Sequence, residues 1–405
     1  MFAAMIRALV LLLVIISVTS ALVVRTKKIT GLDDHTVGNV RARMLDFSKK
    51  SWELGCATQA LLELENSDIS VYGDNPFPPG RVLATNSPIV AISRHVLATR
   101  PPKMLPLMED GATGDPASMG IAVLLTGRAL NNRTYASAVA DQLVFLLAHA
   151  PRSHSGAISH RVEEVQLWND FIYMGPPFIA YMGAIERNYT LLLEAKRQIG
   201  LYRDVLRDPR SGLWRHIVLG RWQEPSLWGT GILRPHFHLH FYIVAHWIGW
   251  TAAGAVRVLQ TIVKSDFAHA LHSHLWELYG WTSELLTATW KYQHRNGAFS
   301  NHPTRKANYT FHDSSFTALL ASATYRFAVQ SGNLTLIPRA DRAFEYVQSQ
   351  IKWDGTLQNV VNVTYWNQKG RYSPEGQAFV LLMHSARRDF VEWQNSGKPP
   401  LMMGI

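Results

Sequence analysis

Two neighbouring segments, DFIYMGPPFIAYMGAIE (Asp170–Glu186) and LLLEAKRQIGLYRDVLRD (Leu191–Asp208), indicate how this 405-residue chain folds. Apolar residues recur in both at spacings of three and four, which is typical of amphipathic helices. The segments follow each other closely, so we expect the two helices to pack as a pair. The double proline Pro176-Pro177 cannot donate backbone hydrogen bonds and should kink or restart the first helix.

The same apolar spacing continues along most of the chain. Few segments alternate between apolar and polar residues as strands do. About a dozen helices in pairs, with no evident linker between them, predict an all-α toroid with one core. The other helical segments that we expect are Asn39–Glu65, Pro116–Leu130, Thr134–Ala150, Trp250–Lys264, Leu271–Trp290, Ser314–Gly332, Arg339–Ile351 and Pro374–Phe390.

The composition limits the class of protein. Hydrophobic residues make up 47% of the chain and 13 residues are tryptophan, so the chain can bury a large core as a single-domain barrel. The formal charge of +10 favours polyanionic partners, either nucleic acid, anionic lipid or an acidic polysaccharide. Because the basic residues form only short pairs and no nucleic-acid-binding spacing occurs, nucleic acid is disfavoured. A solvated basic surface is the simpler interpretation of the charge.

The N-terminus predicts secretion. In MFAAMIRALVLLLVIISVTSA (Met1–Ala21), Arg7 precedes a short apolar run that ends in small residues. This pattern is typical of a signal peptide, here residues 1–21, with an uncleaved membrane anchor as the alternative. We therefore expect a secreted, extracellular domain at 22–405 with no membrane contact after cleavage. Cys56 is the only cysteine, and N-glycosylation sequons begin at Asn132, Asn188, Asn308, Asn333 and Asn362.

Loops between the helices are rich in Trp, Gly, Asn and Asp. Examples are GLWRH (212–216), HRNGAFSN (294–301) and KWDGTLQN (352–359). Aromatic rings stack on sugars and polar groups fix sugar hydroxyls, so loops of this kind at one end of a toroid suit a carbohydrate cleft.

Four pieces of the sequence resemble a known family. Together they are similar to the unsaturated rhamnogalacturonyl hydrolases of glycoside hydrolase family 105, relatives of the unsaturated glucuronyl hydrolases, and in particular to the fungal secreted branch. The resemblance keeps its order from about Asp33 to the C-terminus and implies an (α/α)6 barrel of six helical hairpins. The pieces are LWNDFIYMGPPFIAYMG (Leu167–Gly183), EAKRQIGLYRDVLRDPRSGLWRH (Glu194–His216), WGTG with GWTAAGAVRVLQTI (Trp228–Gly231 and Gly249–Ile262) and HDSSFTALLASATYRFAV (His312–Val329).

The resemblance implies a reaction that needs no cofactor or metal. Members release a 4,5-unsaturated galacturonic acid from the non-reducing end of short pectin-derived oligosaccharides. They hydrate the enol-ether double bond: a carboxylic acid protonates C4, water adds at C5, and the hemiketal then opens. Two alternatives stay open, a secreted glycan-binding toroid without catalysis and a metal-dependent enzyme built on a histidine-rich stretch.

Asp170 falls on the catalytic aspartate of that family. Its neighbours Trp168, Phe171 and Tyr173 make the local environment partly apolar, so desolvation should raise the pKa of Asp170 above about 3.9. A useful protonated fraction would then remain at mildly acidic pH. The alternative is that the Asp170 side chain only caps the following helix.

The resemblance implies further substrate contacts. For Asp115 a helix cap before Pro116 is an equal alternative, and each tryptophan could instead belong to the core. Thr230 stands where bacterial members carry an arginine that can meet the uronic carboxylate, so another group must bind it. His312 and Asp313 are expected to cap a helix. The expected contact residues are Asp115, His216, Trp168, Trp228, Trp250, Thr230, His160 and Arg161.

The stretch RPHFHLHFYIVAHW (Arg234–Trp247) separates two halves of one family motif. Its alternating histidines could ligate zinc, but no Asp or Glu between Glu224 and Asp266 can orient them. We interpret Ile232–Ile248 as a foreign insertion, such as an unremoved intron. Sequencing the transcript tests this, because a message that encodes all of these residues would contradict an intron origin.

Overall fold

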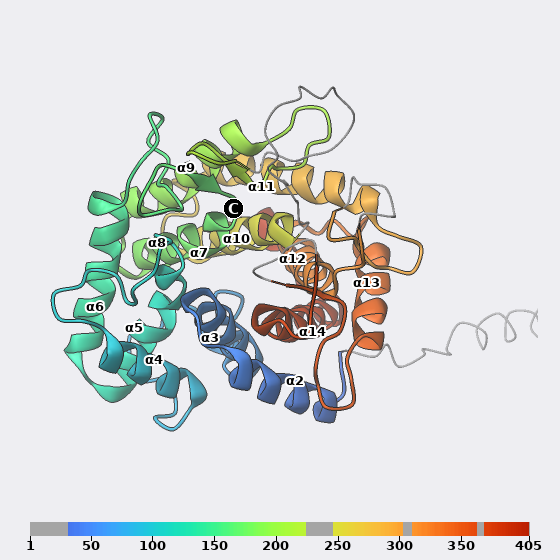
Figure 1. Cartoon of the computed structure of the whole chain (residues 1–405), viewed down its shortest axis with the longest axis horizontal. Coiled ribbons are helices and arrows are strands. Elements are labelled where there is room, and N and C mark those ends of the chain that lie inside the picture. The colour runs from blue at the N-terminus through green and yellow to red at the C-terminus, as the bar shows by residue number, and fades with distance from the viewer. Residues whose placement is uncertain (1–30, 224–245, 303–309, 363–367, 405) are drawn as a thin grey trace, which may run out of the picture.

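The helices form two concentric rings (Figure 1). The computed structural model describes residues 31–223, 246–302, 310–362 and 368–404. The inner ring contains α3 (Ser51–Glu65), α5 (Gly120–Leu130), α8 (Pro176–Ile185), α10 (His246–Lys264), α12 (Ser314–Ser331) and α14 (Pro374–Ser396). The outer ring contains α2 (Asp34–Phe47), α4 (Pro88–Thr99), α6 (Arg133–Val144), α9 (Tyr189–Leu206), α11 (His272–Thr289) and α13 (Ile337–Ser349).

The inner ring closes on itself. Each inner helix packs against the next, from α3 through α5, α8, α10 and α12 to α14, and α14 returns to α3. Each also packs on outer helices, such as α8 on α9 and α12 on α13. The expected (α/α)6 barrel of six helical hairpins is confirmed.

Inner-ring and outer-ring helices differ in how many of their side chains are buried. In α12 almost every side chain is buried, from Ser314 to Gln330, as expected of a helix that is enclosed on all sides. In α13 the buried positions Ile337, Ala340, Phe344 and Val347 form a single stripe, as in a helix that covers a core from outside. None of the described helices is long and apolar enough to cross a bilayer.

The prediction of a single helix over Asn39–Glu65 is wrong. The structure has two helices, α2 and α3, separated at 48–50. The side chain of Glu53 accepts hydrogen bonds from the backbone N–H groups of Lys49 (2.7 Å) and Lys50 (2.8 Å). A carboxylate that satisfies these donors starts a new helix without any proline or glycine at the break. Helix α4 was also not expected from the sequence.

The restart at the double proline is confirmed. The short helix α7 (Phe171–Met174) ends at Gly175, and α8 begins at Pro176. Because each inner helix follows an outer helix that runs the opposite way, all inner helices begin at the same end of the barrel. We call this end the site end.

The loops at the site end carry four short strands. Strand β1 (Leu167–Trp168) pairs antiparallel with β2 (Ile217–Val218), with Leu167 opposite Val218 and Trp168 opposite Ile217. Strand β3 (Val360–Val361) pairs antiparallel with β4 (Lys369–Gly370). The β1–β2 ladder joins the α6–α7 and α9–α10 connections, and the β3–β4 ladder closes the α13–α14 connection on itself.

The opposite end contains a separate cavity of about 370 Å³. Its lining includes Gln260, Arg326, Asp389 and Trp393, which lie in the C-terminal halves of α10, α12 and α14. Arg326 forms ion pairs with Glu63 (2.8 Å) and Asp389 (2.5 Å). Among the expected site residues that the structure describes, none borders this cavity.

Two regions of the sequence lie outside the described residues. The expected signal peptide at 1–21 is one of them. Most of the expected insertion at 232–248 is the other, and only 246–248 are described, as the first turn of α10. Both interpretations therefore stay predictions.

The close contact between α10 and α7 gives a stability test. A Cβ atom at Gly254 would lie 2.1 Å from the backbone oxygen of Ile172, whereas one at Gly280 in α11 would meet nothing within 4 Å. Gly254→Ala should destabilise the protein by about 1–3 kcal/mol through overpacking. Gly280→Ala should stabilise it by about 0.5–1 kcal/mol, since alanine favours an exposed helix. Urea unfolding measures both; equal effects would show that the contact is not close.

Candidate active site

Asp170 and His216 meet at the site end of the barrel. Asp170 directly precedes α7 and His216 directly precedes β2. The backbone N–H of Asn169 donates to the carbonyl oxygen of His216 (3.0 Å), which extends the β1–β2 ladder by one residue. This register places Oδ2 of Asp170 3.2 Å from Nε2 of His216. Asp170 makes no side-chain cap hydrogen bond to α7, so the capping interpretation is wrong.

Burial keeps the imidazole of His216 neutral. The side chain is only 2% exposed, while that of Asp170 is 15% exposed. Desolvation, with a smaller contribution from His160, holds the pKa of His216 well below its usual value of 6.5. The structure therefore places a neutral imidazole beside a carboxyl group, with 3.2 Å between Nε2 and Oδ2.

Asp115 brings a second carboxyl group to the site. It precedes the short helix η2 (Pro116–Met119), makes no side-chain cap hydrogen bond and is 7% exposed. Its Oδ1 atom has no hydrogen-bond partner among the described residues. Burial raises the pKa of Asp115 well above 3.8, Asp110 and Asp170 raise it further, and Arg161 opposes them. Burial therefore favours the neutral form of Asp115, and its side chain is not a helix cap.

Trp168 forms an aromatic wall beside these groups. His160 stacks on it with ring centroids 4.7 Å apart, and His216 meets it edge-on at 5.3 Å. The guanidinium carbon of Arg161 lies 5.9 Å from the Trp168 ring centroid. The structure thus brings together Trp168, His160, Arg161 and His216 as expected from the sequence, together with Asp170.

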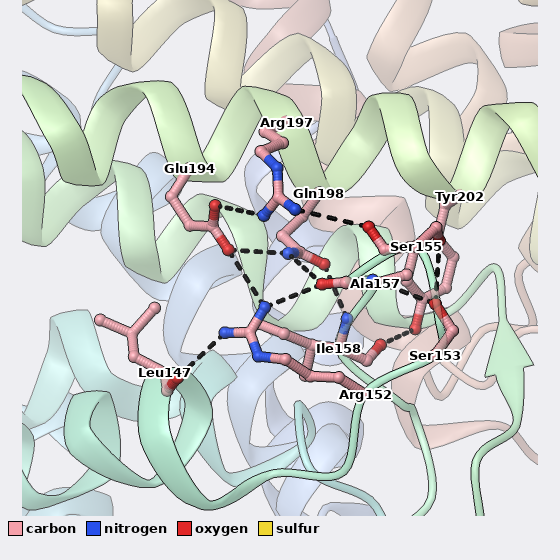
Figure 2. Close-up of polar contacts among 11 residues, drawn as sticks. Leu147, Arg152, Ser153, Ser155, Ala157, Ile158, Glu194, Arg197, Gln198 and Tyr202 are labelled. Carbon is pink, nitrogen blue, oxygen red and sulfur yellow. Dashed lines mark hydrogen bonds and ion pairs between the residues drawn. The ribbon is translucent and has the colours of Figure 1, made fainter.

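Helix α9 holds the loop that carries His160 and Arg161 (Figure 2). The side-chain oxygen of Gln198 accepts from the backbone N–H of Ile158 (2.8 Å), and the hydroxyl of Tyr202 donates to the carbonyl oxygen of Ile158 (2.6 Å). Glu194 accepts from the side chain of Gln198 (2.8 Å) and forms an ion pair with Arg152 of the loop (3.3 Å). These bonds fix the loop two residues before His160.

The other expected residues have different positions. Trp250 is 3% exposed and packs edge-on against Tyr173 (4.6 Å) and Phe379 (4.8 Å), which favours a role in the core over sugar stacking. Trp228 and Thr230 lie outside the described residues. The expected cap at Asp313 is confirmed, because its side chain accepts from the backbone N–H groups of Ser315 and Phe316 in α12.

Two residues near the site were not expected. Asn169 is fully buried, and neither side-chain amide atom has a hydrogen-bond partner among the described residues. Such a group is costly to bury and is often kept for a functional reason. Trp222 meets Trp168 edge-on at 5.5 Å. The position of Asn169 between Trp168 and Asp170 was the only signal available for it, and no pattern pointed to Trp222.

A double ring of helices that gathers carboxyl groups beside a tryptophan at one end is the architecture of (α/α)6 glycoside hydrolases. Residues 110–379 match the sequence model of Glycosyl Hydrolase Family 88, and the chain belongs to this family. No curated protein sequence matches the chain.

Solved structures of similar fold agree with this class. A glycoside hydrolase of family 105 from C. acetobutylicum has a TM-score of 0.64 at 17% identity, over 88% of this chain and 98% of that chain. A glycosyl hydrolase family 88 protein from Bacteroides vulgatus has a TM-score of 0.63 at 13% identity, over 88% and 97%. An α-1,6-mannanase from Salegentibacter sp. has a TM-score of 0.55 at 13% identity, over 88% and 98%. At these identities the likeness shows the fold alone.

The buried His160 gives a pH test. Burial and Arg161 lower the pKa of His160 from 6.5 to about 3. The unfolded chain therefore binds a proton below pH 6.5 that the folded chain does not, and stability falls as the pH drops from 6.5 toward 3. His160→Gln should reduce this acid loss, measured as the change in urea midpoint between pH 7 and pH 4.5. The exposed His149→Gln is the control; an unchanged acid loss in His160→Gln would contradict the assignment.

Proposed function

We propose that the protein releases 4,5-unsaturated galacturonic acid from the non-reducing end of pectin-derived oligosaccharides. The observation that supports this best is the 3.2 Å contact between Asp170 and His216 at the site end of a family 88 barrel. The resemblance to family 105 and its fungal secreted branch supplies the substrate class. The same resemblance supports a secreted glycoprotein whose signal peptide has been removed.

Asp170 carries the chemistry in this proposal. As a carboxylic acid it donates its proton to C4 of the enol ether, and the resulting carboxylate accepts a proton from the water that adds at C5. The product is a hemiketal, which opens by breaking the bond between C5 and the ring oxygen. Opening leaves C1 as a hemiacetal that releases the remaining sugar. Because one carboxyl group serves as acid and then base, the usual distance rule for paired glycosidase carboxylates does not apply.

Neutral neighbours favour the protonated form of Asp170. A charged imidazole beside it would stabilise the carboxylate, but burial lowers the pKa of His216 and favours its uncharged form. Asp115, held neutral by burial, can donate a hydrogen bond to a sugar hydroxyl or to the attacking water. We therefore assign His216 to positioning the Asp170 proton and Asp115 to substrate contact.

Arg161 is the cation that we assign to the substrate carboxylate. It has no carboxylate within 4.0 Å among the described residues, and it lies beside the Trp168 ring. The planar guanidinium can bind a carboxylate through two parallel hydrogen bonds. This assignment gives the uronic carboxylate a partner although Thr230 stands in place of the family arginine.

Replacing the proton donor tests the proposal. Asp170→Asn should lower the rate by about 10²–10⁴-fold, because the amide cannot donate a carboxylic proton. The measurement is loss of the ultraviolet absorbance of the double bond in lyase-treated rhamnogalacturonan or homogalacturonan.

The matched control is Asp141→Asn. Asp141 lies on α6 and forms an ion pair with Arg100 (2.8 Å), and the side chain of Asp141 is 40% exposed. This variant should keep its activity. Wild-type protein that binds these oligosaccharides without consuming the double bond would instead indicate a non-catalytic glycan-binding toroid. Loss of only a few-fold in Asp170→Asn would reject Asp170 as the general acid.

A further inference from the structure

The outer helix α2 carries a row of contacts that ends near the active site. Asn39, Arg43 and Phe47 are spaced by four residues and therefore share one face of α2. The side-chain amide of Asn39 donates to the carbonyl oxygen of Trp353 (3.0 Å), and Nε of Arg43 donates to that of Asp354 (3.2 Å).

The C-terminal end of the same face holds a second aromatic residue. The ring of Phe47 lies 4.5 Å from that of Tyr372, which precedes the N-cap of α14. Trp353 and Tyr372 are thus anchored at two points of one helix. These points are eight residues apart, or about 12 Å at ~1.5 Å per residue, which is longer than a single sugar ring.

Both aromatic side chains are exposed although their backbones are held in place. Trp353 is 89% exposed and Tyr372 is 51% exposed. The turn at Trp353 is closed by the backbone bonds from Lys352 N–H to Thr356 (3.0 Å) and from Gly355 N–H to Lys352 (2.9 Å). A rigid turn that presents a tryptophan to solvent exposes apolar area that the core could otherwise bury.

Basic residues flank these two rings along the chain: Lys352 precedes Trp353 and Arg371 precedes Tyr372. Lys49, Lys50, Lys352, Lys369 and Arg371 are exposed, and none of them forms an ion pair with a described residue. Two acidic residues of this face, Asp46 and Asp354, share the single guanidinium of Arg43 at 3.5 Å and 3.4 Å, and the five exposed cations outnumber them. We call Trp353, Tyr372 and these five cations the α2 surface.

The α2 surface is continuous with the site. Helix α2 ends and α3 begins at the site end, where the hydroxyl of Ser51 contacts the carboxylate of Asp110. Asp110 raises the pKa of Asp115, and Gly111 lies against the guanidinium of Arg161. Figure 1 shows α2 at the edge of the ring beside α14 and α3.

We propose that the α2 surface binds the remote sugars of an acidic oligosaccharide whose non-reducing end lies at Asp170. Aromatic faces stack on sugar rings and the cations neutralise uronic carboxylates, so the surface matches a polyuronate in both respects. The identity of the sugar rests on the proposed function, whereas the binding itself does not. The protein would therefore bind a long unsaturated oligomer more tightly than a dimer.

Affinity electrophoresis through intact, de-esterified polygalacturonate tests the binding without any turnover. Trp353→Ala should weaken the retardation about tenfold, which corresponds to ~1.4 kcal/mol, and Tyr372→Ala should weaken it in the same direction. Trp276→Ala is the matched control, because Trp276 is 44% exposed on α11. It should behave as wild type, and an uncharged galactan should retard none of the proteins.

Several outcomes would overturn the proposal. Retardation of Trp353→Ala equal to that of wild type would do so, as would an equal loss in Trp276→Ala. Equal binding of the wild-type protein to DNA or to anionic lipid vesicles would indicate a general basic surface instead of a sugar site. Thermal unfolding midpoints close to wild type show that the variants are folded, since both replaced side chains are exposed.

A kinetic comparison separates this proposal from the proposed function. With an unsaturated dimer, Trp353→Ala should match wild type. With a long unsaturated oligomer, its KM should rise about tenfold, because ~1.4 kcal/mol of binding is lost equally from the ground state and the transition state. A rise with both substrates would contradict the remote position. If wild type consumes neither double bond, the proposed function fails while the electrophoresis still decides the binding surface.

Discussion

The contact between Asp170 and His216 depends on a ladder only two residue pairs long. Strands β1 and β2 place residues 46 positions apart in the sequence within 3.2 Å of each other. So short a ladder cannot offset the entropy of closing that loop by itself. The cost is met by the intervening helices α8 and α9, which pack as a hairpin and bring the two strands together. The chemistry at the site end therefore depends on hydrophobic packing below it.

Burial then determines which groups at the site carry charge. It raises the pKa of Asp115 and lowers those of His160 and His216, so burial favours the neutral form of all three residues. Arg161 is left as a cation without a carboxylate partner among the described residues. A uronic substrate supplies that missing negative charge, whereas a neutral sugar would leave the guanidinium unbalanced.

Much of the fold could be predicted from the sequence because apolar spacing fixes helices locally. The pattern failed at 48–50, where the side chain of Glu53 ends one helix and starts the next, since no proline or glycine marks the break. Asp170 and His216 could be identified from motifs, but their contact depends on a strand register that neither motif contains. For Trp250 the sequence left a sugar platform and a core position open, because a core tryptophan and an exposed one look alike in a sequence; its burial favours the core.

The positions of the basic residues of the α2 surface also could not be predicted from the sequence alone. Along the sequence the cations of the α2 surface occur as separate short groups around 49–50, 352 and 369–371, which resembled an ordinary solvated surface. The connections that carry them, from α2 to α3 and from α13 to α14, both lie at the site end. In an (α/α)6 barrel every outer-to-inner connection meets there. Scattered charges in those connections therefore add up to a local field at the mouth of the site, while charges in the opposite loops do not contribute to it.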